Sequence, residues 1–186
     1  MTATQIIELQ KRVGTTPDGF WGPKSTDACQ RHLRSLMPKT NPWPNSNQSS
    51  IRAFYGPPGE SNLTNLDVTG LGVLYLGKTV KTIRCHKLVA ESLHRVLSEI
   101  ARSSSSEVLT KYAGCFNLRP MRGGTSLSTH SWGIAIDLDP GNNGNRVHWP
   151  CQAKMPIEVM ESFSREGWLS AGAFWSRDSM HFQATR

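Results

Sequence analysis

The spacing of apolar side chains predicts a pair of helices near the start of the chain. In residues 4–36 these side chains return every three or four positions, as on one face of a helix. The first helix has three of them, Ile6, Leu9 and Val13. Thr2 and Gln5 can form a capping box at its start, Gly14 can end it, and Pro23 can open the second helix. We therefore expect a helical hairpin.

The pattern is lost in residues 37–62, which are rich in Pro, Ser and Asn. The prolines of this segment are Pro38, Pro42, Pro44, Pro57 and Pro58. Such a composition favours a linker or a segment that wraps over the surface. We therefore divide the chain into a helical domain at 1–38, a linker at 39–62 and a larger domain at 63–186.

In the larger domain, some segments have apolar positions spaced as in strands and others have them spaced as in helices. Residues 73–76 and 79–83 flank Gly77 and predict a short hairpin. A helical period marks residues 86–102 as an amphipathic helix, and Pro156 can start another helix that ends at Gly167. Shorter β-like stretches follow at 113–118, 133–138 and 181–183. This order of elements indicates an α+β fold.

Length and composition fit a soluble protein with one good core and a small accessory domain. The chain has 186 residues, of which 37% are hydrophobic and 19% charged. Its apolar runs, such as residues 70–76, are too short to cross a bilayer, so we expect no membrane insertion. The first residues lack the basic and apolar blocks of a secretory signal, so another protein would have to deliver the chain outside the cytoplasm.

The net charge of +7 does not identify a partner by itself. A basic balance favours any polyanion, including nucleic acid and anionic cell envelopes. The excess is spread along the chain without a Lys/Arg block, and we expect no nucleic-acid partner. The four cysteines form no CxxC pair and are scattered, which favours buried free thiols over disulfides or zinc ligation. They are Cys29, Cys85, Cys115 and Cys151.

A candidate metal site begins in the stretch that contains His130 and Asp137. Ile134 and Ile136 alternate with Ala135 and Asp137, which is the period of a strand with one branched apolar face. Asp137 would point away from the isoleucines. His130 lies in the turn that leads into this strand, close enough to share a site with the carboxylate.

A second imidazole, His181, stands near the end of the chain between Met180 and Phe182. In an extended segment these two apolar side chains would point away from the imidazole. Two histidines and one carboxylate make a sound zinc triad, with a fourth position left for water. Asp178 is three residues before His181, near enough to move a proton between that water and a leaving amine.

Taken singly, these residues have ordinary explanations. A histidine in an apolar strand is more often packed or hydrogen-bonded than bound to metal, and Asp137 and Asp178 could be turn or loop carboxylates. Together they resemble the M15 family of peptidases, whose pattern is S-x-H-x-x-G-x-A-x-D followed late by acid-x-x-H. Here the fixed positions are filled by Ser128, His130, Gly133, Ala135, Asp137, Asp178 and His181.

The resemblance covers about residues 80–186 and implies an antiparallel sheet flanked by helices. It also implies Zn²⁺ on His130, Asp137 and His181, with Asp178 as general base. The family places an arginine upstream of the first metal ligand. Its guanidinium group is permanently charged and stabilises the oxyanion by hydrogen bonds. Two arginines, Arg119 and Arg122, are candidates for this role, and Arg119 is favoured because it follows the β-like run at 113–118. Arg122, otherwise a surface charge, and Ser128 are expected to contact substrate.

One departure affects the expected substrate groove. Relatives often carry a Trp-Gly-Gly-like stretch before the final acid, whereas residues 170–175 here read SAGAFW. The metal ligands are unaffected by this change, but the shape of the groove is not fixed by the resemblance.

The first domain resembles the type 1 peptidoglycan-binding domain, whose signature is LQ…DGxfGpxT. The matching residues are Leu9-Gln10 and the stretch from Asp18 to Thr26. In this unit Gly19 and Gly22 serve tight turns, and Phe20 and Trp21 supply apolar area. Both aromatic residues could simply form the core of this small unit, and for Phe20 we expect that.

A wall-binding domain joined to a stem-peptide peptidase resembles a bacteriophage endolysin. We expect a monomer that is made in the host cytoplasm without a signal peptide and reaches the wall through a phage pore. The expected target is the L-Ala–D-Glu bond of peptidoglycan. Two alternatives stay open, a bacterial D-alanyl-D-alanine carboxypeptidase that remodels the wall, and a non-catalytic wall-binding protein that keeps zinc for structure.

Other candidate ligands have simpler explanations. His94 lies on the solvated face of its helix, His32 lies in the small domain, and His148 lies in a loop. The oxygen-rich stretch that starts at Asp139 could hold calcium, but it lacks the spacing of a known calcium loop and a turn is the simpler interpretation.

Overall fold

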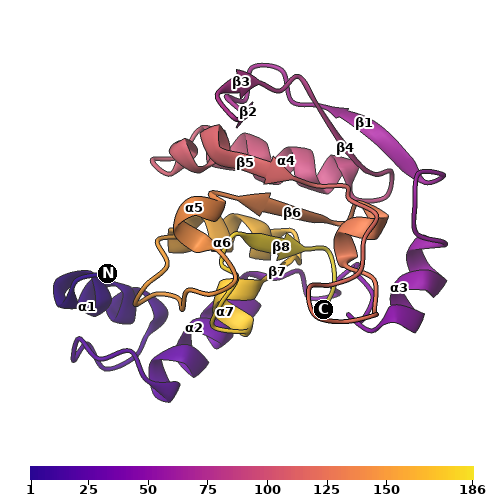
Figure 1. Ribbon diagram of the computed structural model, residues 1–186. Helices are drawn as coiled ribbons and strands as arrows, with labels where there is room; N and C mark the ends of the chain where they lie inside the picture. Colours follow the sequence, from indigo (N-terminus) through magenta and orange to yellow (C-terminus); the bar gives the residue numbers. More distant parts are fainter.

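A four-stranded antiparallel sheet lies at the centre of the computed structural model, which describes residues 1–186 (Figure 1). Its strands run in the order β5 (Tyr112–Gly114), β6 (Ala135–Leu138), β8 (His181–Gln183) and β7 (Leu169–Ser170). Two smaller antiparallel pairs stand at one end, β1 (Leu63–Asp67) with β4 (Thr82–His86) and β2 (Leu74–Tyr75) with β3 (Lys78–Thr79). The α+β fold with a flanked antiparallel sheet is confirmed.

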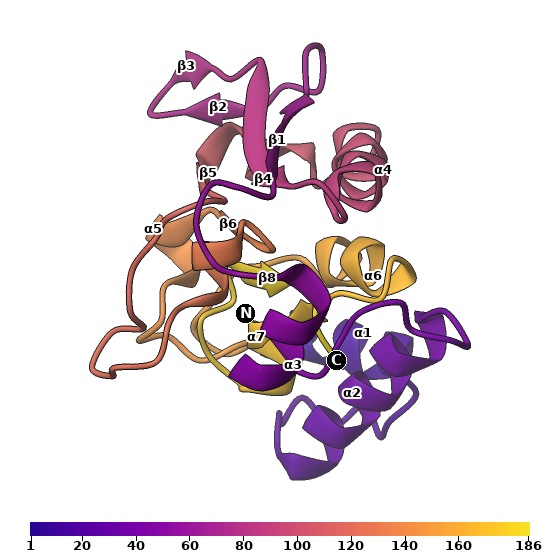
Figure 2. The ribbon, with the colours of Figure 1, turned by 90° about the vertical axis from the view of Figure 1, so that its right-hand side faces the viewer.

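Helices cover one face of the sheet and leave the metal-site residues near its other face. α4 (Ala90–Ala101) and α6 (Ile157–Arg165) lie side by side on the covered face (Figure 2). α4 buries one apolar stripe, made of Leu93, Val96, Leu97 and Ile100. Truncating such a fully buried leucine to alanine costs about 2–5 kcal/mol. The short helices are η1 (Ser106–Lys111), η2 (Thr129–Trp132), α5 (Pro140–Asn143) and α7 (Ala171–Phe174).

The predicted helical hairpin is confirmed as α1 (Ala3–Val13) and α2 (Pro23–Leu36). The capping box of Thr2 and Gln5 is formed, and Gly14 ends α1 in the left-handed conformation. Gln10 is fully buried between the helices, where its amide nitrogen donates to Asp18 Oδ1 at 2.8 Å and to the Phe20 carbonyl at 2.9 Å. The Leu-Gln…Asp-Gly motif therefore stabilises the loop between the two helices through the hydrogen bonds of Gln10.

The position of Phe20 was wrong in the sequence-based prediction. Its side chain is 73% exposed and lies against the backbone of Gly22, because Gln10 fills the centre of the unit instead. Trp21 is half-buried and packs edge-on against Trp149 of the larger domain, with ring centroids 5.4 Å apart. Of these two adjacent aromatic residues, Phe20 therefore faces solvent and Trp21 contacts the larger domain.

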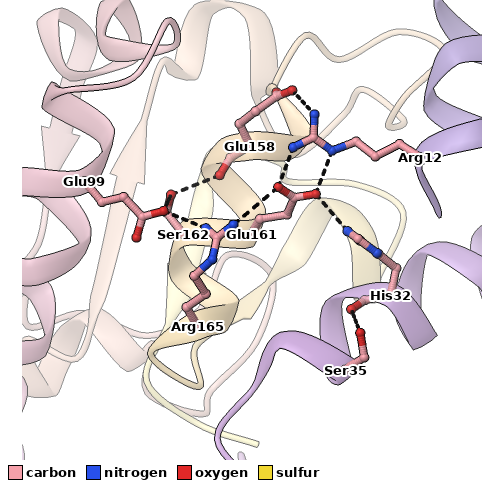
Figure 3. A network of polar contacts seen from close by, with 8 residues as sticks. All are labelled: Arg12, His32, Ser35, Glu99, Glu158, Glu161, Ser162 and Arg165. Atoms are coloured by element: carbon pink, nitrogen blue, oxygen red, sulfur yellow. Dashed lines mark hydrogen bonds and ion pairs between the residues drawn. The ribbon is translucent and has the colours of Figure 1, made fainter.

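The hairpin packs firmly against α6 through a polar network (Figure 3). Arg12 donates two hydrogen bonds to the buried Glu161, at 2.8 and 2.6 Å, and a third to Glu158. His32 Nε2 lies 2.8 Å from Glu161, so this histidine has a structural partner rather than a metal. Apolar residues of the hairpin belong to the same core cluster as those of the sheet domain.

Residues 39–62 wrap over the larger domain rather than hang as a flexible linker. They contain α3 (Gln48–Tyr55), which was not predicted because the segment is rich in proline. This helix buries Ile51 and Tyr55. The Tyr55 hydroxyl donates to the Ala184 carbonyl at 2.7 Å, and Trp43 Nε1 donates to the Glu166 carbonyl at 2.8 Å. These contacts fit the surface-wrap interpretation, while the proposed domain boundaries stay a prediction.

Several predicted elements are present with shifted ends. The helix expected at 86–102 begins at Ala90, because His86 belongs to β4 and its Nδ1 accepts a hydrogen bond from the Leu88 amide. The hairpin around Gly77 is formed by β2 and β3, and residues 82–83 belong to β4 instead. Three cysteines are buried free thiols as expected, whereas Cys151 is exposed. No helix combines the length and the apolar character needed to cross a membrane.

Candidate metal centre

Three side chains far apart in the sequence meet at one point of the sheet. Asp137 in β6 and His181 in β8 are direct cross-strand partners. His130 lies in η2, the short turn before β6. The structure therefore brings together the three residues that the sequence predicts as metal ligands.

The ligand atoms of this cluster face one another at close range. His130 Nε2 lies 3.2 Å from His181 Nδ1 and 3.3 Å from Asp137 Oδ1. His181 Nδ1 lies 3.1 Å from the same carboxylate oxygen. Two nitrogens and one oxygen at one point form a donor set of the kind that zinc takes in catalytic sites.

Gly133 allows the turn that carries His130 to pack closely on β4. Its φ of +66° lies in the left-handed region, which favours glycine. A Cβ at this position would lie 2.8 Å from Leu63 Cδ2 and 3.0 Å from the His86 amide nitrogen. The glycine of the sequence motif is therefore needed for both the backbone angle and the space.

In each imidazole, the ring nitrogen that faces away from the cluster forms a hydrogen bond, and this bond determines which nitrogen carries the hydrogen. His130 Nδ1 lies 2.7 Å from the Cys115 carbonyl, which can only accept, so this nitrogen carries the hydrogen. His181 Nε2 lies 3.0 Å from Gln183 Oε1. The Gln183 amide nitrogen donates to Thr185 Oγ at 2.6 Å, which leaves its oxygen free to accept from His181. Both rings therefore direct lone pairs at the shared point, as metal-ligating histidines do.

The electrostatics of the cluster also favour a positive charge at this point. Burial alone would raise the pKa of Asp137, but the contacts with His130 and His181, which donate to the carboxylate when the rings are doubly protonated, outweigh it and hold that pKa well below the usual range. Burial would lower the pKa of His181, and the contact with Asp137 raises it instead. A proton or a divalent cation relieves the repulsion between the facing lone pairs, so the residues present fit zinc.

Asp178 lies close enough to the cluster for His181, Asp137 and His130 to affect its pKa. Its backbone φ is +59°, an uncommon value for a residue other than glycine, and strain of this kind clusters at functional sites. Its Oδ1 is buried and no donor of the protein reaches it. Burial raises the pKa of Asp178, and the nearby charge of His181 partly opposes that change. An acceptor that is free and more basic than usual suits the predicted general base.

The cluster opens into a groove of about 640 Å³ that is rich in arginine. His130 and Asp137 line this groove, and so do Arg84, Arg119 and Arg122. Arg84 is already paired with Glu60 at 2.6 Å, so the guanidinium groups of Arg119 and Arg122 are the ones that favour a substrate with carboxylates. The groove therefore has room for a peptide segment at the metal centre.

The two arginines considered for the oxyanion differ in their surroundings. Arg119 is half-buried, its backbone is held by Ser131, and its Nη1 donates to the Pro120 carbonyl at 3.2 Å. Arg122 is exposed, and its charge acts to lower the pKa of Asp178. Both line the groove, so the preference for Arg119 stays a prediction.

Ser128 is buried at the start of η2. Its hydroxyl accepts a hydrogen bond from the His130 amide at 3.4 Å, and it does not line the groove. This placement favours a role in orienting His130, and a contact between Ser128 and substrate stays a prediction.

Gln183, Cys115 and Trp175 were not predicted from the sequence as residues of this site. Gln183 could have been found, because alternation along a strand puts residue 183 on the same face as His181. Cys115 acts through its backbone carbonyl, which leaves no sequence signal. Trp175 is 45% exposed and lies beside His181, with ring centroids 6.3 Å apart.

Comparison with known proteins supports this interpretation of the site. Residues 122–184 match the model of a peptidase family described as D-alanyl-D-alanine carboxypeptidase. The matched segment is roughly a third of the chain, includes His130, Asp137, Asp178 and His181, and excludes Arg119. No curated protein and no solved structure has significant similarity to the chain. The site is therefore similar to that of the M15 peptidases, which supports a zinc-type peptidase that acts on peptidoglycan.

Proposed function

We propose that the chain hydrolyses the peptide stems of bacterial peptidoglycan at the centre formed by His130, Asp137 and His181. One observation carries this proposal. Two imidazole nitrogens and a carboxylate oxygen converge at one point, and two of these side chains, those of His130 and Asp137, line an open groove. Asp178 lies nearby, with a buried Oδ1 that has no hydrogen-bond partner. A purely structural zinc site is normally closed by a fourth protein ligand.

The residues of the site divide the reaction between them. Zinc bound by the three ligands would supply a Lewis acid that polarises the scissile carbonyl and activates water. Asp178 accepts the proton of the attacking water at its free Oδ1 and gives it to the leaving amine. Arg119 donates to the oxygen that becomes negative, and its charge persists at any working pH. Arg122, which forms no ion pair within the protein, holds a substrate carboxylate.

For the biological role we propose a bacteriophage endolysin that cuts the L-Ala–D-Glu bond. The N-terminal hairpin would hold the enzyme on the wall, and the exposed ring of Phe20 offers an apolar surface for that contact. The protein would act as a monomer, without nucleic acid, and would reach the wall from the host cytoplasm through a phage pore. The resemblance of the hairpin to a peptidoglycan-binding domain supports this role.

A carboxypeptidase for wall remodelling is the second candidate. The description of the matched family, D-alanyl-D-alanine carboxypeptidase, favours it. The two activities differ in their products, because a carboxypeptidase releases free D-alanine and an endopeptidase releases longer stem fragments.

Digestion of purified peptidoglycan followed by mass spectrometry tests the proposal. We expect cut stem peptides, intact glycan strands, and no cleavage when a chelator removes zinc. Release of stem fragments with a new N-terminal D-glutamate, with L-alanine left on the glycan, would support the endopeptidase, and release of D-alanine the carboxypeptidase. New reducing sugar ends with uncut peptides would rule out both.

The variant Asp178→Ala separates the enzyme from a non-catalytic zinc protein. We expect it to retain zinc, since no ligand is changed, and to lose activity by roughly 10²- to 10⁴-fold, the usual contribution of a general base. Asp27→Ala, which removes an exposed carboxylate from α2, is the matched control. If wild type and Asp178→Ala are equally inactive on peptidoglycan while both bind zinc, the catalytic assignment fails.

A further inference from the structure

A second groove lies between the N-terminal hairpin and the sheet domain. It measures about 490 Å³ and is bordered by α2, by the segment after it and by α7. Its lining includes Arg34 and Lys39 on one side, Phe174 and Trp175 on the other, and Arg186. The groove exists because the hairpin docks on α6, so it belongs to neither part alone.

The charged side chains that line the groove are all basic. No acidic side chain lines it, and none of its three basic side chains forms an ion pair. The Arg34 guanidinium lies 4.9 Å from the centre of the Phe174 ring. Stacking of this kind restrains the side chain while leaving its N–H groups free to donate. The surface therefore suits a ligand that carries carboxylates.

Trp175 connects this groove to the metal centre. Its indole lines the groove, and it also lies beside the imidazole of His181. With 45% of its surface exposed, the ring offers an apolar face between the two sites. Trp175 therefore lies next to both the second groove and the metal centre, so a polymer bound at one of them comes close to the other.

We propose that this basic groove binds a second, neighbouring stem peptide of the peptidoglycan network through its free carboxylates. The inference rests on the proposed function, since the first stem peptide must occupy the metal centre. In a cross-linked wall, stem peptides occur in pairs, and each carries carboxylates that Arg34 and Lys39 can hold. The groove thereby selects cross-linked substrate over isolated stems.

The test compares binding of two soluble probes, a cross-linked muropeptide dimer and a muropeptide monomer. All proteins carry zinc and Asp178→Ala, so that the probes are not cut during calorimetry. The groove variant Arg34→Ala/Lys39→Ala is compared with Lys24→Ala/Arg31→Ala, which removes the same charge from exposed positions of α2 outside the groove. Equal melting temperatures establish that both variants are folded.

We expect the groove variant to bind the dimer about tenfold more weakly than the control variant does, as for loss of a charge-assisted hydrogen bond. Equal affinities of the two variants for the dimer would overturn the inference, as would duplex DNA that competes with the dimer at equal concentration. Failure of the proposed function gives a different result. In that case the parent protein binds neither probe, and the wild type leaves peptidoglycan uncut.

Discussion

Two carboxylates that are largely shielded from solvent, those of Glu161 and Asp137, have opposite surroundings. Glu161 in α6 accepts two hydrogen bonds from Arg12 and lies 2.8 Å from His32, and Arg165 is 3.8 Å away (Figure 3). Asp137 in β6 has two imidazoles within 3.3 Å, and no lysine or arginine forms an ion pair with it.

The difference shows how a structural site and a metal site can be distinguished. A buried carboxylate is costly unless a charge compensates it. Arg12 supplies a permanent cation to Glu161, so that network is complete without a ligand. The histidines beside Asp137 instead direct lone pairs at the carboxylate oxygen, because their other nitrogens are bound to Cys115 and Gln183. Only the second arrangement calls for an added cation.

Removing each carboxylate should therefore have different consequences, and this is the largest expected effect. We expect Asp137→Ala to lose zinc almost completely, with loss of peptidase activity, because two histidines alone form an incomplete site. Glu161→Gln should keep the zinc content of the wild type. Metal analysis of the purified proteins measures the difference. A zinc content for Asp137→Ala equal to that of Glu161→Gln would contradict the assignment of the centre.

The second effect concerns the stability of the Glu161 network. Arg12→Ala leaves a buried carboxylate with an incomplete set of partners, and we expect the free energy of unfolding to fall by about 2–3 kcal/mol. The neighbouring Lys11 forms an exposed ion pair with Glu8, so Lys11→Ala is the control and should cost less than about 1 kcal/mol. Urea denaturation measures both. If both variants lose the same free energy of unfolding, the Glu161 network stabilises the protein no more than an exposed ion pair does.

The sequence predicts the metal centre better than it predicts the contacts around it. His130, Asp137 and His181 follow from residue type, strand alternation and a motif with fixed spacing. Their outer partners do not, because the Cys115 carbonyl has no side-chain signature and Gln183 is informative only once its strand is known. The Arg12–Glu161 pair joins residues that are 149 positions apart, and local patterns contain no information at that range.

The fold shows the same limit. Helices with a clear period, such as α1, α2 and α4, were predicted to within a few residues. The proline-rich segment that contains α3 was interpreted from composition alone, although Ile51 and Tyr55 are buried by tertiary packing. Phe20 was expected inside because it is apolar, yet a buried glutamine holds the centre of that unit. In both cases tertiary contacts overrode local preference.

The third prediction tests whether Gln183 orients His181. Gln183→Leu removes the acceptor for His181 Nε2, and we expect zinc affinity to fall by about 10- to 100-fold, as for other outer partners of metal-bound histidines. Gln183→Glu keeps an acceptor at the same place and should restore most of the affinity. Competition with a chromophoric chelator measures it. Equal affinity of Gln183→Leu and wild type would show that the contact does not position the ligand.

The smallest effect is the dependence of stability on pH that Glu161 contributes. Burial raises the pKa of Glu161, but the hydrogen bonds from Arg12 and His32 outweigh it and hold the pKa below its usual value of 4.5. The unfolded chain therefore takes up a proton at a higher pH than the folded chain does. The contribution of Glu161 is complete above about pH 5 and is lost as the pH falls through the folded pKa.

Urea denaturation of the zinc-free wild type and Glu161→Gln, from about pH 6 to about pH 4, isolates this contribution. Asp137 also titrates at acidic pH, but it is present in both proteins, so its effect cancels in the comparison. We expect the stability difference between the two proteins to shrink as the pH falls. A difference that stays constant over this range would mean that the Glu161 carboxylate gains nothing from Arg12 and His32. The difference between the surroundings of Glu161 and Asp137 would then be supported only by the positions of their neighbouring side chains.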